Sequence, residues 1–183
     1  GFFLGEHGLY DKRFMYEEAL RMPFVVRWPN GIKAGSTSDA MGINCDFAPT
    51  FLELAGAPVP GDMQGTSLIP VWKGKKPANW RRSIYYRYYH DPGDHNTRAH
   101  YGVRTTTHKL IYFWKKDQWE CYDLKKDPAE MRNIYSDPGA QKTVAALKQE
   151  LQRLRKELKD TDQFAESQPT ESSYVQAPPP KKR

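Results

Sequence analysis

Four short segments rich in aromatic and β-branched residues occupy the stretch between residues 83 and 124. Such side chains favour β-strands because they pack well on a pleated surface. Most gaps between the segments are only a few residues long, which favours antiparallel hairpins over parallel crossovers. Lys116–Asp117–Gln118 is the expected tight turn. The segments predicted to form this antiparallel sheet are 83–89, 101–105, 109–114 and 119–124.

A long amphipathic helix is predicted after the sheet, from about residue 140 to residue 160. Apolar residues recur there at spacings of three and four, which places them on one helix face. They are Val144, Leu147, Leu151, Leu154 and Leu158. Packing of this face on the sheet is favoured over a coiled coil, because the repeat is short. Residues 161–183 lose the periodicity and are rich in Gln, Ser, Thr and Pro, so we expect a disordered tail.

The first 80 residues have a different pattern. Pro23–Pro29 is a short β-branched and aromatic run between two prolines, which predicts a buried strand. A helix is predicted over 47–55, with Pro49 tolerated in its first turn, and a second short helix over 68–73. Lys73–Pro77 is expected to link this region to the sheet. The predicted domains are 1–80, 81–160 and 161–183.

The composition favours a domain with a real core. The chain has 183 residues, 13% of them aromatic, and no apolar run approaches the ~20 residues of a membrane-spanning helix. The net charge of +6 is spread along the chain, so no nucleic-acid partner is expected. Cys45 and Cys121 form no metal or redox motif, and we expect small buried side chains rather than a disulfide. Because the chain opens without Met or a signal peptide, we expect the C-terminal part of a longer protein.

The opening of the chain combines glycine with ionisable residues. These are Gly1, Gly5 and Gly8 together with Glu6, His7, Asp11, Lys12 and Arg13. Glycine tolerates backbone angles that other residues avoid, and functional residues concentrate on loops held by a rigid scaffold. The pattern therefore indicates a site, although a solvated surface loop has the same composition. Arg21 is expected to be structural and to pair with Glu17, four positions earlier.

This opening resembles a segment of the sulfatase family. The resemblance is carried by Leu4-Gly5-Glu6-His7-Gly8 and then by Lys12, Tyr16, Glu17, Arg21 and Pro23. Similar pieces downstream are Asp46–Thr50, Gln64–Leu68, His100–Thr105, Lys109–Tyr112 and Trp119–Leu124. The resemblance implies the last part of an alkaline-phosphatase-like α/β domain. It also implies a following α+β subdomain of about four antiparallel strands and one long C-terminal helix.

The resemblance also implies the chemistry. Sulfatases are sulfuric-ester hydrolases that use a formylglycine and a calcium ion, and the motifs for both are absent here. No metal ligand is therefore expected in this chain, and the chain alone is expected to be inactive. Lys12 matches the family lysine that contacts the sulfate, and it is the expected catalytic residue because its ammonium is a compact point charge. Arg13 is expected to matter little, whereas His7, His100 and Arg104 are expected to contact the substrate.

The predicted substrate is a sulfated small molecule or glycan, and the predicted partner is the rest of the sulfatase chain. The family resemblance implies a periplasmic, secreted or lysosomal location, and no membrane span is expected. Two alternatives remain open: a phosphodiester or phosphonate hydrolase of the same superfamily, and a non-catalytic polyanion-binding module. The second is favoured if four basic residues cluster on one sheet face. These are Arg87, Arg98, Arg104 and Lys109.

Overall fold

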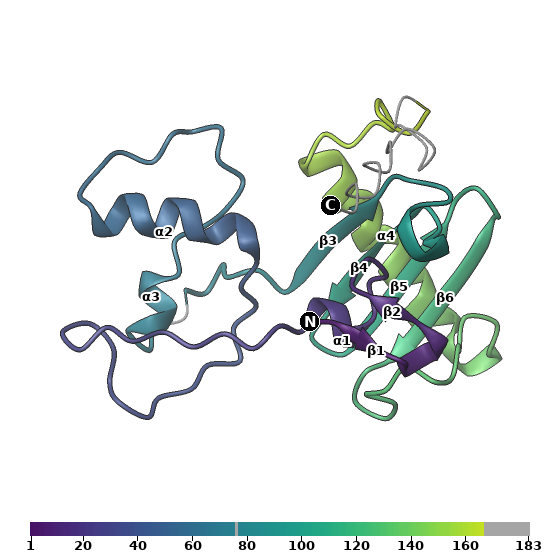
Figure 1. The fold of residues 1–183 in the computed structure, drawn as a ribbon, viewed down its shortest axis with the longest axis horizontal. Coiled ribbons are helices and arrows are strands. Elements are labelled where there is room, and N and C mark those ends of the chain that lie inside the picture. Colours follow the sequence, from purple (N-terminus) through teal and green to yellow (C-terminus); the bar gives the residue numbers. More distant parts are fainter. Residues whose placement is uncertain (76, 167–183) are drawn as a thin grey trace, which may run out of the picture. The chain divides into compact units, whose positions relative to one another are not determined.

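The computed structural model describes residues 1–75 and 77–166, which form two compact units (Figure 1). One unit consists of Gly1–Met22 together with the described residues from Tyr85 to Glu166, and the other of Pro23–Ile84. Residues 167–183 of the predicted disordered tail lie outside the described residues. No helix in the described ranges is long and apolar enough to cross a membrane.

The first unit is built on a four-stranded sheet in the order β3-β4-β5-β6. The strands are β3 (Ser83–Tyr88), β4 (His100–Thr105), β5 (His108–Phe113) and β6 (Gln118–Asp123). Antiparallel pairing joins β4 to β5 and β5 to β6, so that Tyr112 lies opposite both Tyr101 and Trp119. The Lys116 amide donates to the Phe113 carbonyl at 3.0 Å and closes the last hairpin. The four predicted strands and the predicted tight turn are confirmed.

One face of the sheet is covered by the long helix α4 (Gln141–Glu157) (Figure 1). The predicted apolar stripe supplies the contact, and Leu151 at its centre has no exposed surface. Leu158 caps the helix and is half-buried. The stripe packs against sheet residues such as Val103, Leu110 and Cys121. The predicted packing of the helix on the sheet is confirmed.

The other face of the sheet is covered by the first residues of the chain. Strands β1 (Phe3–Leu4) and β2 (Tyr10–Asp11) pair antiparallel, and the short helix α1 (Glu17–Leu20) follows. Successive strand residues point to opposite faces of a sheet. Leu110 and Cys121 therefore face α4, whereas the next residues along the strands, Ile111 and Tyr122, face the opening segment. The shared core consists of Phe3, Met15, Tyr16, Ala19, Ile111, Phe113, Tyr122 and Leu124. Gly1–Met22 thus forms one compact unit with the sheet, whereas the assignment of 1–80 to a catalytic domain stays a prediction.

The second unit holds two helices and a small core. They are α2 (Phe47–Leu54) and α3 (Ile69–Trp72), which confirm the predicted helices to within two residues. The small core consists of Leu68, Val71 and Trp80. The buried Asp46 carboxylate accepts from the Thr66 amide at 2.8 Å and pairs with Arg81, which fastens the loops around it.

Two predictions in this unit are wrong. Pro23–Pro29 forms no strand, and Phe24 and Val25 are 53% and 91% exposed. A strand needs partners for its backbone groups, and no described residue pairs with this run. Cys45 is exposed rather than buried, because it lies in the short turn before α2. Cys121 is buried as predicted, and both thiols are free.

Candidate functional site

The opening segment folds into a hairpin whose turn depends on unusual backbone angles. Gly5 has φ 125° and Gly8 has φ 68°, values that favour glycine. The Gly5 amide donates to the Leu9 carbonyl at 3.0 Å, and this bond closes the loop. The Glu6 carboxylate accepts from the Leu4 amide at 2.6 Å, a hydrogen bond that lowers the pKa of Glu6. The two glycines therefore allow a compact turn that leads into β2, and Lys12 directly follows that strand.

Lys12 is exposed and makes no ion pair with any described residue, while the residues on both sides of it are held in place. Asp11 is buried with φ 85°, and the Arg13 guanidinium pairs with both Asp11 and Asp94. The Tyr86 hydroxyl donates to the Arg13 carbonyl at 2.6 Å, and burial raises the pKa of Tyr86 to about 12, so it keeps its proton. Lys12 is thus a free ammonium on a fixed backbone. Arg13, expected to matter little, is a principal anchor of this loop.

His7 lies at the edge of the same segment. Its ring stacks on Tyr16 with 4.3 Å between the ring centroids, and its side chain is 13% exposed. The Tyr16 hydroxyl donates to the Glu120 carboxylate at 2.8 Å. Burial, followed by the charge of Glu120, raises the pKa of Tyr16. His7 therefore rests on a tyrosine that is itself tied to strand β6.

Arg104 belongs to a buried ion-pair network that fixes α1 to the sheet. The Glu17 carboxylate pairs with Arg104 at 2.9 Å and with Lys109 at 3.0 Å. Lys109 also pairs with Glu130 at 2.6 Å, and neither of these two side chains is exposed. Burial alone would raise the pKa of Glu17, but Arg104 and Lys109 outweigh it and lower that pKa to about 2. Glu17 thus has these two partners, and the expected pair with Arg21 is absent; Arg21 is exposed.

His100 is a core residue. It has no exposed surface, and its ring stacks on Phe14 with 5.4 Å between the centroids. Its Nδ1 atom forms a hydrogen bond with the Arg98 carbonyl oxygen at 2.7 Å. Burial lowers the pKa of His100 to about 4, so the ring is neutral at pH 7. Of the sequence-predicted site residues, Lys12 and His7 both lie in the opening segment, the first exposed and the second mostly buried, while His100 stacks on Phe14 in the core and Arg104 is held by Glu17.

An open pocket of about 230 Å³ lies within the first unit, and the opening segment that contains Lys12 forms part of its wall. Its walls come from the opening segment, from the loop before β4, and from the β5–β6 hairpin. The lining residues are His7, Leu9, Phe14, Tyr16, Arg98, Phe113, Lys116, Gln118 and Glu120. Sequence reasoning missed Phe14 and Lys116 as site residues, because no motif marks them and only the fold brings their segments together.

The four basic residues of the polyanion-binding alternative do not form an exposed patch. Arg87 is 4% exposed and pairs with Asp160 at 2.7 Å. Lys109 and Arg104 are engaged by Glu17, and Arg98 lies 3.3 Å from Asp91. Since a carboxylate neutralises each of them, this alternative loses the observation that would support it.

A metal ion has no candidate site in residues 1–75 and 77–166. These ranges hold no group of three or more His, Cys, Asp or Glu side chains that could bind one. Calcium in proteins takes six to eight oxygen ligands, so the described residues do not fit the ion that the family resemblance implies. No calcium chemistry is assigned to them.

Comparison with known proteins gives several relatives described as sulfatases. The chain is 54% identical over 165 residues to an N-acetylglucosamine-6-O-sulfatase of Bacteroides thetaiotaomicron, covering 88% of this chain and 30% of that protein. It is 30% identical over 161 residues to an ulvan-active sulfatase of Formosa agariphila, covering 73% of this chain and 32% of that protein. The chain thus spans about a third of the length of the relatives it matches.

The fold has a close match among solved structures. A protein solved in complex with its substrate, D-glucosamine-2-N,6-O-disulfate, superposes with a TM-score of 0.85 at 53% identity. The match covers 88% of this chain and 33% of that one. The sequence-based prediction of the C-terminal part of an alkaline-phosphatase-like fold is confirmed.

A family model described as "N-sulphoglucosamine sulphohydrolase, C-terminal" matches residues 5–157. These residues include the opening segment from Gly5 onward, the whole four-stranded sheet and all of α4. The chain therefore belongs to this sulfatase family and corresponds to its C-terminal part.

Proposed function

We propose that the full-length protein containing this chain hydrolyses sulfate esters of a sulfated glycan, and that its target is a 6-O-sulfate on a glucosamine residue. The observation that carries the proposal is the 54% identity to an N-acetylglucosamine-6-O-sulfatase over nearly the whole chain. The substrate in the solved structure with the same fold also carries a 6-O-sulfate. A periplasmic, secreted or lysosomal location fits an enzyme that acts on such polymers.

Lys12 is the catalytic residue that this chain contributes. Its ammonium is free of other partners in the described chain, and its backbone is fixed on both sides by Asp11 and Arg13. A preorganised charge that needs no rearrangement is effective where negative charge grows in the transition state. Lys12 would bind a sulfate oxygen and stabilise the charge that develops as the ester bond breaks. The formylglycine and calcium implied by the family would supply the nucleophile and a hard cation from residues outside this chain.

His7 forms part of the substrate pocket in this proposal, because its half-buried ring lines the cavity. His100 and Arg104 are left out of it. A side chain with no exposed surface, such as His100, does not touch a ligand in this conformation. Arg104 is held by Glu17 and serves the network that fixes α1. Both residues support the segment that carries Lys12 and His7.

The test compares sulfate positions with the purified full-length enzyme. We expect release of sulfate from 6-O-sulfated N-acetylglucosamine and none from its 3-O- or 4-O-sulfated isomers. The 183-residue chain alone should release none from any of them. A phosphonate or phosphate diester offered under the same conditions tests the superfamily alternative. Hydrolysis of the diester with no hydrolysis of the 6-O-sulfate would replace the proposed function with that alternative.

A further inference from the structure

The pocket of about 230 Å³ is formed by residues on both sides of Lys12 in the chain. Leu9 lies three positions before Lys12, and Phe14 lies two positions after it. Consecutive Cα atoms are about 3.8 Å apart, so the Cα atoms of Lys12 and Phe14 are within roughly 8 Å of each other. The backbone of Lys12 therefore lies near the pocket wall, at a separation that one or two sugar rings can span.

The charges around the pocket leave positive charge available. Arg98 and Lys116 are cationic, and Glu120 is the only carboxylate in the lining. The hydroxyls of Tyr16 and Tyr122 both donate to the Glu120 carboxylate, at 2.8 and 3.0 Å. Glu120 thus accepts hydrogen bonds from two neutral hydroxyl groups, and no ion pair joins it to Arg98 or Lys116.

The two cations differ in how far they are engaged: Arg98 has one carboxylate partner, Asp91, and Lys116 has none among the described residues. Lys116 is exposed and has no ion pair with any residue that the structure describes. Arg98 is 31% exposed and uses one terminal nitrogen for its ion pair with Asp91 at 3.3 Å, which leaves its other donors available. A guanidinium has five donors and an ammonium has three, so most of the donors at this pocket are unused. Gln118 adds an exposed amide to the same wall.

The remaining wall is aromatic and rigid. Phe14 stacks on the buried His100 and lies 6.2 Å from Phe113 between ring centroids. Binding sites for small molecules combine such apolar walls with a few polar groups that fix the orientation. A sugar ring has apolar C–H faces and polar edges, and it fits a wall of this kind when its edge carries a negative charge for Arg98 and Lys116.

We propose that this pocket is a subsite for a second anionic group of the glycan, a carboxylate or sulfate on the sugar next to the one that is desulfated. The proposal rests on the proposed function, because Lys12 defines where the scissile sulfate is bound. Arg98 and Lys116 are binding residues here and take no part in breaking the ester bond. The subsite would make the enzyme prefer acidic oligosaccharides over sulfated monosaccharides.

The test measures kcat/KM of the full-length enzyme on three substrates. They are a 6-O-sulfated glucosamine monosaccharide, its disaccharide with a neutral neighbouring sugar, and its disaccharide with a uronic acid or sulfated neighbour. Charge-assisted hydrogen bonds are among the stronger polar contacts, but exposed ones are weakened by solvent and salt. Lys116→Ala and Arg98→Ala should each lower kcat/KM about tenfold on the acidic disaccharide, through KM, and leave the other two substrates unchanged. Whether the uronic acid or the sulfated neighbour shows the effect identifies the anion.

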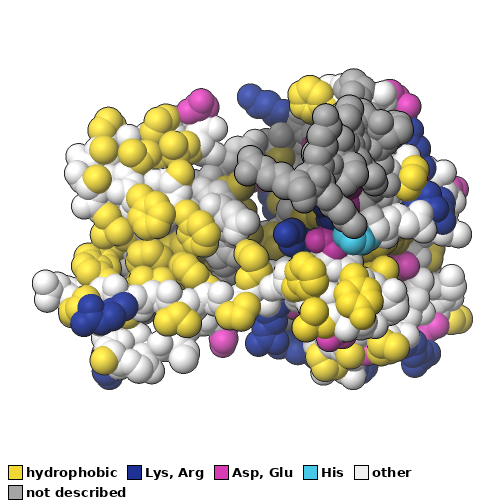
Figure 2. All heavy atoms as spheres, viewed as in Figure 1, with side chains coloured by type: hydrophobic (Ala, Val, Ile, Leu, Met, Phe, Trp, Pro, Cys, Tyr) yellow, Lys and Arg dark blue, Asp and Glu magenta, His cyan; other side chains and the backbone are white. Residues whose placement is uncertain are grey.

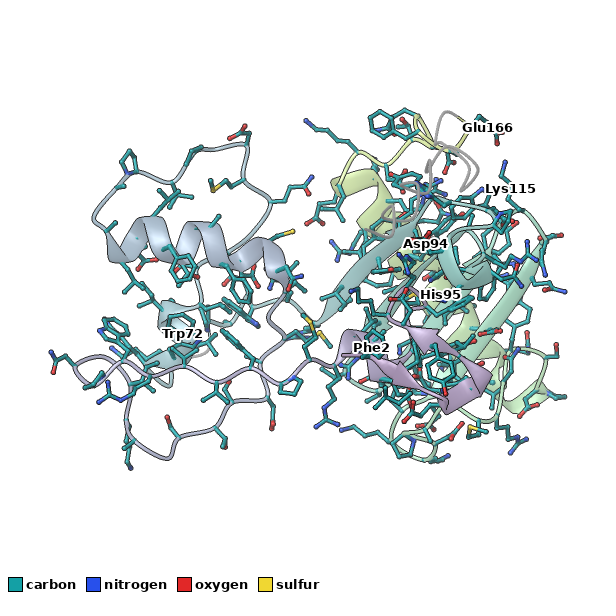
Figure 3. The ribbon with its side chains drawn as sticks, viewed as in Figure 1. Phe2, Trp72, Asp94, His95, Lys115 and Glu166 are labelled. Atoms are coloured by element: carbon teal, nitrogen blue, oxygen red, sulfur yellow. The ribbon has the colours of Figure 1, made fainter. Side chains whose placement is uncertain are left out.

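Lys115→Ala is the matched control. Lys115 occupies the same hairpin turn, but it pairs with Glu166 at 2.8 Å and does not line the pocket, and Figure 3 shows these two side chains close together. Its loss should leave all three substrates unchanged. A higher salt concentration should reduce the effect of Lys116→Ala on kcat/KM for the acidic disaccharide. Lys115→Ala should have no effect at either salt concentration.

Three results would overturn the subsite. One is equal loss on the monosaccharide and the acidic disaccharide, and another is a Lys115→Ala effect equal to that of Lys116→Ala. If the enzyme hydrolyses none of the sulfates, the proposed function fails while the subsite is still tested by calorimetric binding of the acidic disaccharide. Lys116→Ala should then weaken that binding about tenfold, and unchanged binding would be the third contrary result.

Discussion

The two compact units bury their apolar residues to very different extents. In the first unit both faces of the sheet are covered, and Val103, Leu110 and Leu151 have no exposed surface. In the second unit the core is small, while Phe24 and Phe51 are 53% and 62% exposed. Figure 2 shows hydrophobic side chains gathered on the visible surface of that unit. The first unit therefore has a hydrophobic core of its own. The second unit exposes apolar side chains that we expect a folded neighbour to cover.

The difference extends to polar groups. The first unit buries a lysine and a glutamate without exposing either, in the network of Lys109, Glu17 and Glu130. Burying charge is costly unless the charges are paired. This network joins α1 to the sheet and therefore helps to fix the segment that carries Lys12. In the second unit, Asp46 plays a local role and ties one loop to α2.

The largest expected effect on stability is at Lys109. Lys109→Ala removes the cation from between two carboxylates, and leaving a buried charge uncompensated costs about 3–5 kcal/mol. Urea denaturation of the 183-residue chain measures this free energy of unfolding. The control is Lys125→Ala, an exposed lysine in the turn after β6, which should change it by less than about 0.5 kcal/mol. Equal, small effects of the two substitutions would mean that the network contributes nothing to the first unit.

Lys12 should separate activity from stability within the same unit. In the full-length enzyme, Lys12→Ala should lower kcat/KM by about 10²–10³, or roughly 3–4 kcal/mol, because it removes charge stabilisation from the transition state. An exposed side chain carries little packing, so the melting temperature should not change. Lys12→Arg should restore little activity, since a planar guanidinium does not replace a point charge. Near-normal activity of Lys12→Ala would remove the catalytic assignment.

The pH dependence of stability should report the burial of His100. The pKa of His100 is about 4 in the folded chain and 6.5 in the reference state. Between these values the unfolded chain binds more protons than the folded one, so stability is complete above pH 6.5 and falls as the pH drops toward 4. The full loss is about 3 kcal/mol, from a difference of about 2.5 pKa units at roughly 1.36 kcal/mol each.

His100→Phe should flatten this slope, because the buried ring then has no titrating group. His95→Asn is the control: His95 is exposed in the short turn before β4, and Asn tolerates its φ of 54°. Denaturation series at pH 7, 6, 5 and 4 give the slopes. A wild-type slope retained in His100→Phe would show that His100 is not the group whose protonation is linked to folding.

Local patterns predicted the sheet unit better than its site. The strands and α4 follow from periodicity that each segment carries itself, and the family motif located Lys12. The partners of residues in the opening segment are far away in sequence: the Arg13 side chain pairs with Asp94, 81 positions on, and the Glu17 backbone amide donates to the Glu130 carboxylate, 113 positions on. No spacing rule reveals such pairs. The Arg21 expectation differed from the structure for this reason, while the mild effect expected of Arg13→Ala stays a prediction. The Pro23–Pro29 strand prediction failed because a strand depends on a neighbour that its own sequence does not specify.

The Arg13 anchor should have a moderate effect on activity. The sequence alone predicted a mild effect of losing Arg13, whereas its ion pairs with Asp11 and Asp94 predict a larger one. Removing its partner by Asp94→Asn should loosen the loop and lower kcat/KM of the full-length enzyme about tenfold, because small misplacements of a catalytic group are costly. Tyr86→Phe, which removes the hydrogen bond to the Arg13 carbonyl, should act in the same direction. Arg13→Lys should retain more activity than Arg13→Ala. If all four variants resembled wild type, Lys12 would not depend on this anchor.

The smallest effect on the free energy of unfolding is expected from Phe51→Ala in the second unit. This substitution tests whether the exposed apolar side chains of that unit are covered only in the full-length protein. Phe51→Ala in the 183-residue chain should change the free energy of unfolding by less than about 0.5 kcal/mol, because the side chain is already mostly exposed. Leu151→Ala, on the helix of the first unit, should cost about 2–5 kcal/mol. In the full-length enzyme the Phe51 substitution should cost more than in the isolated chain, because a folded neighbour would bury that face. A cost of several kcal/mol in the isolated chain would mean that the face is already covered there, by self-association or otherwise. Sedimentation of the chain at two concentrations distinguishes self-association from a better-packed second unit.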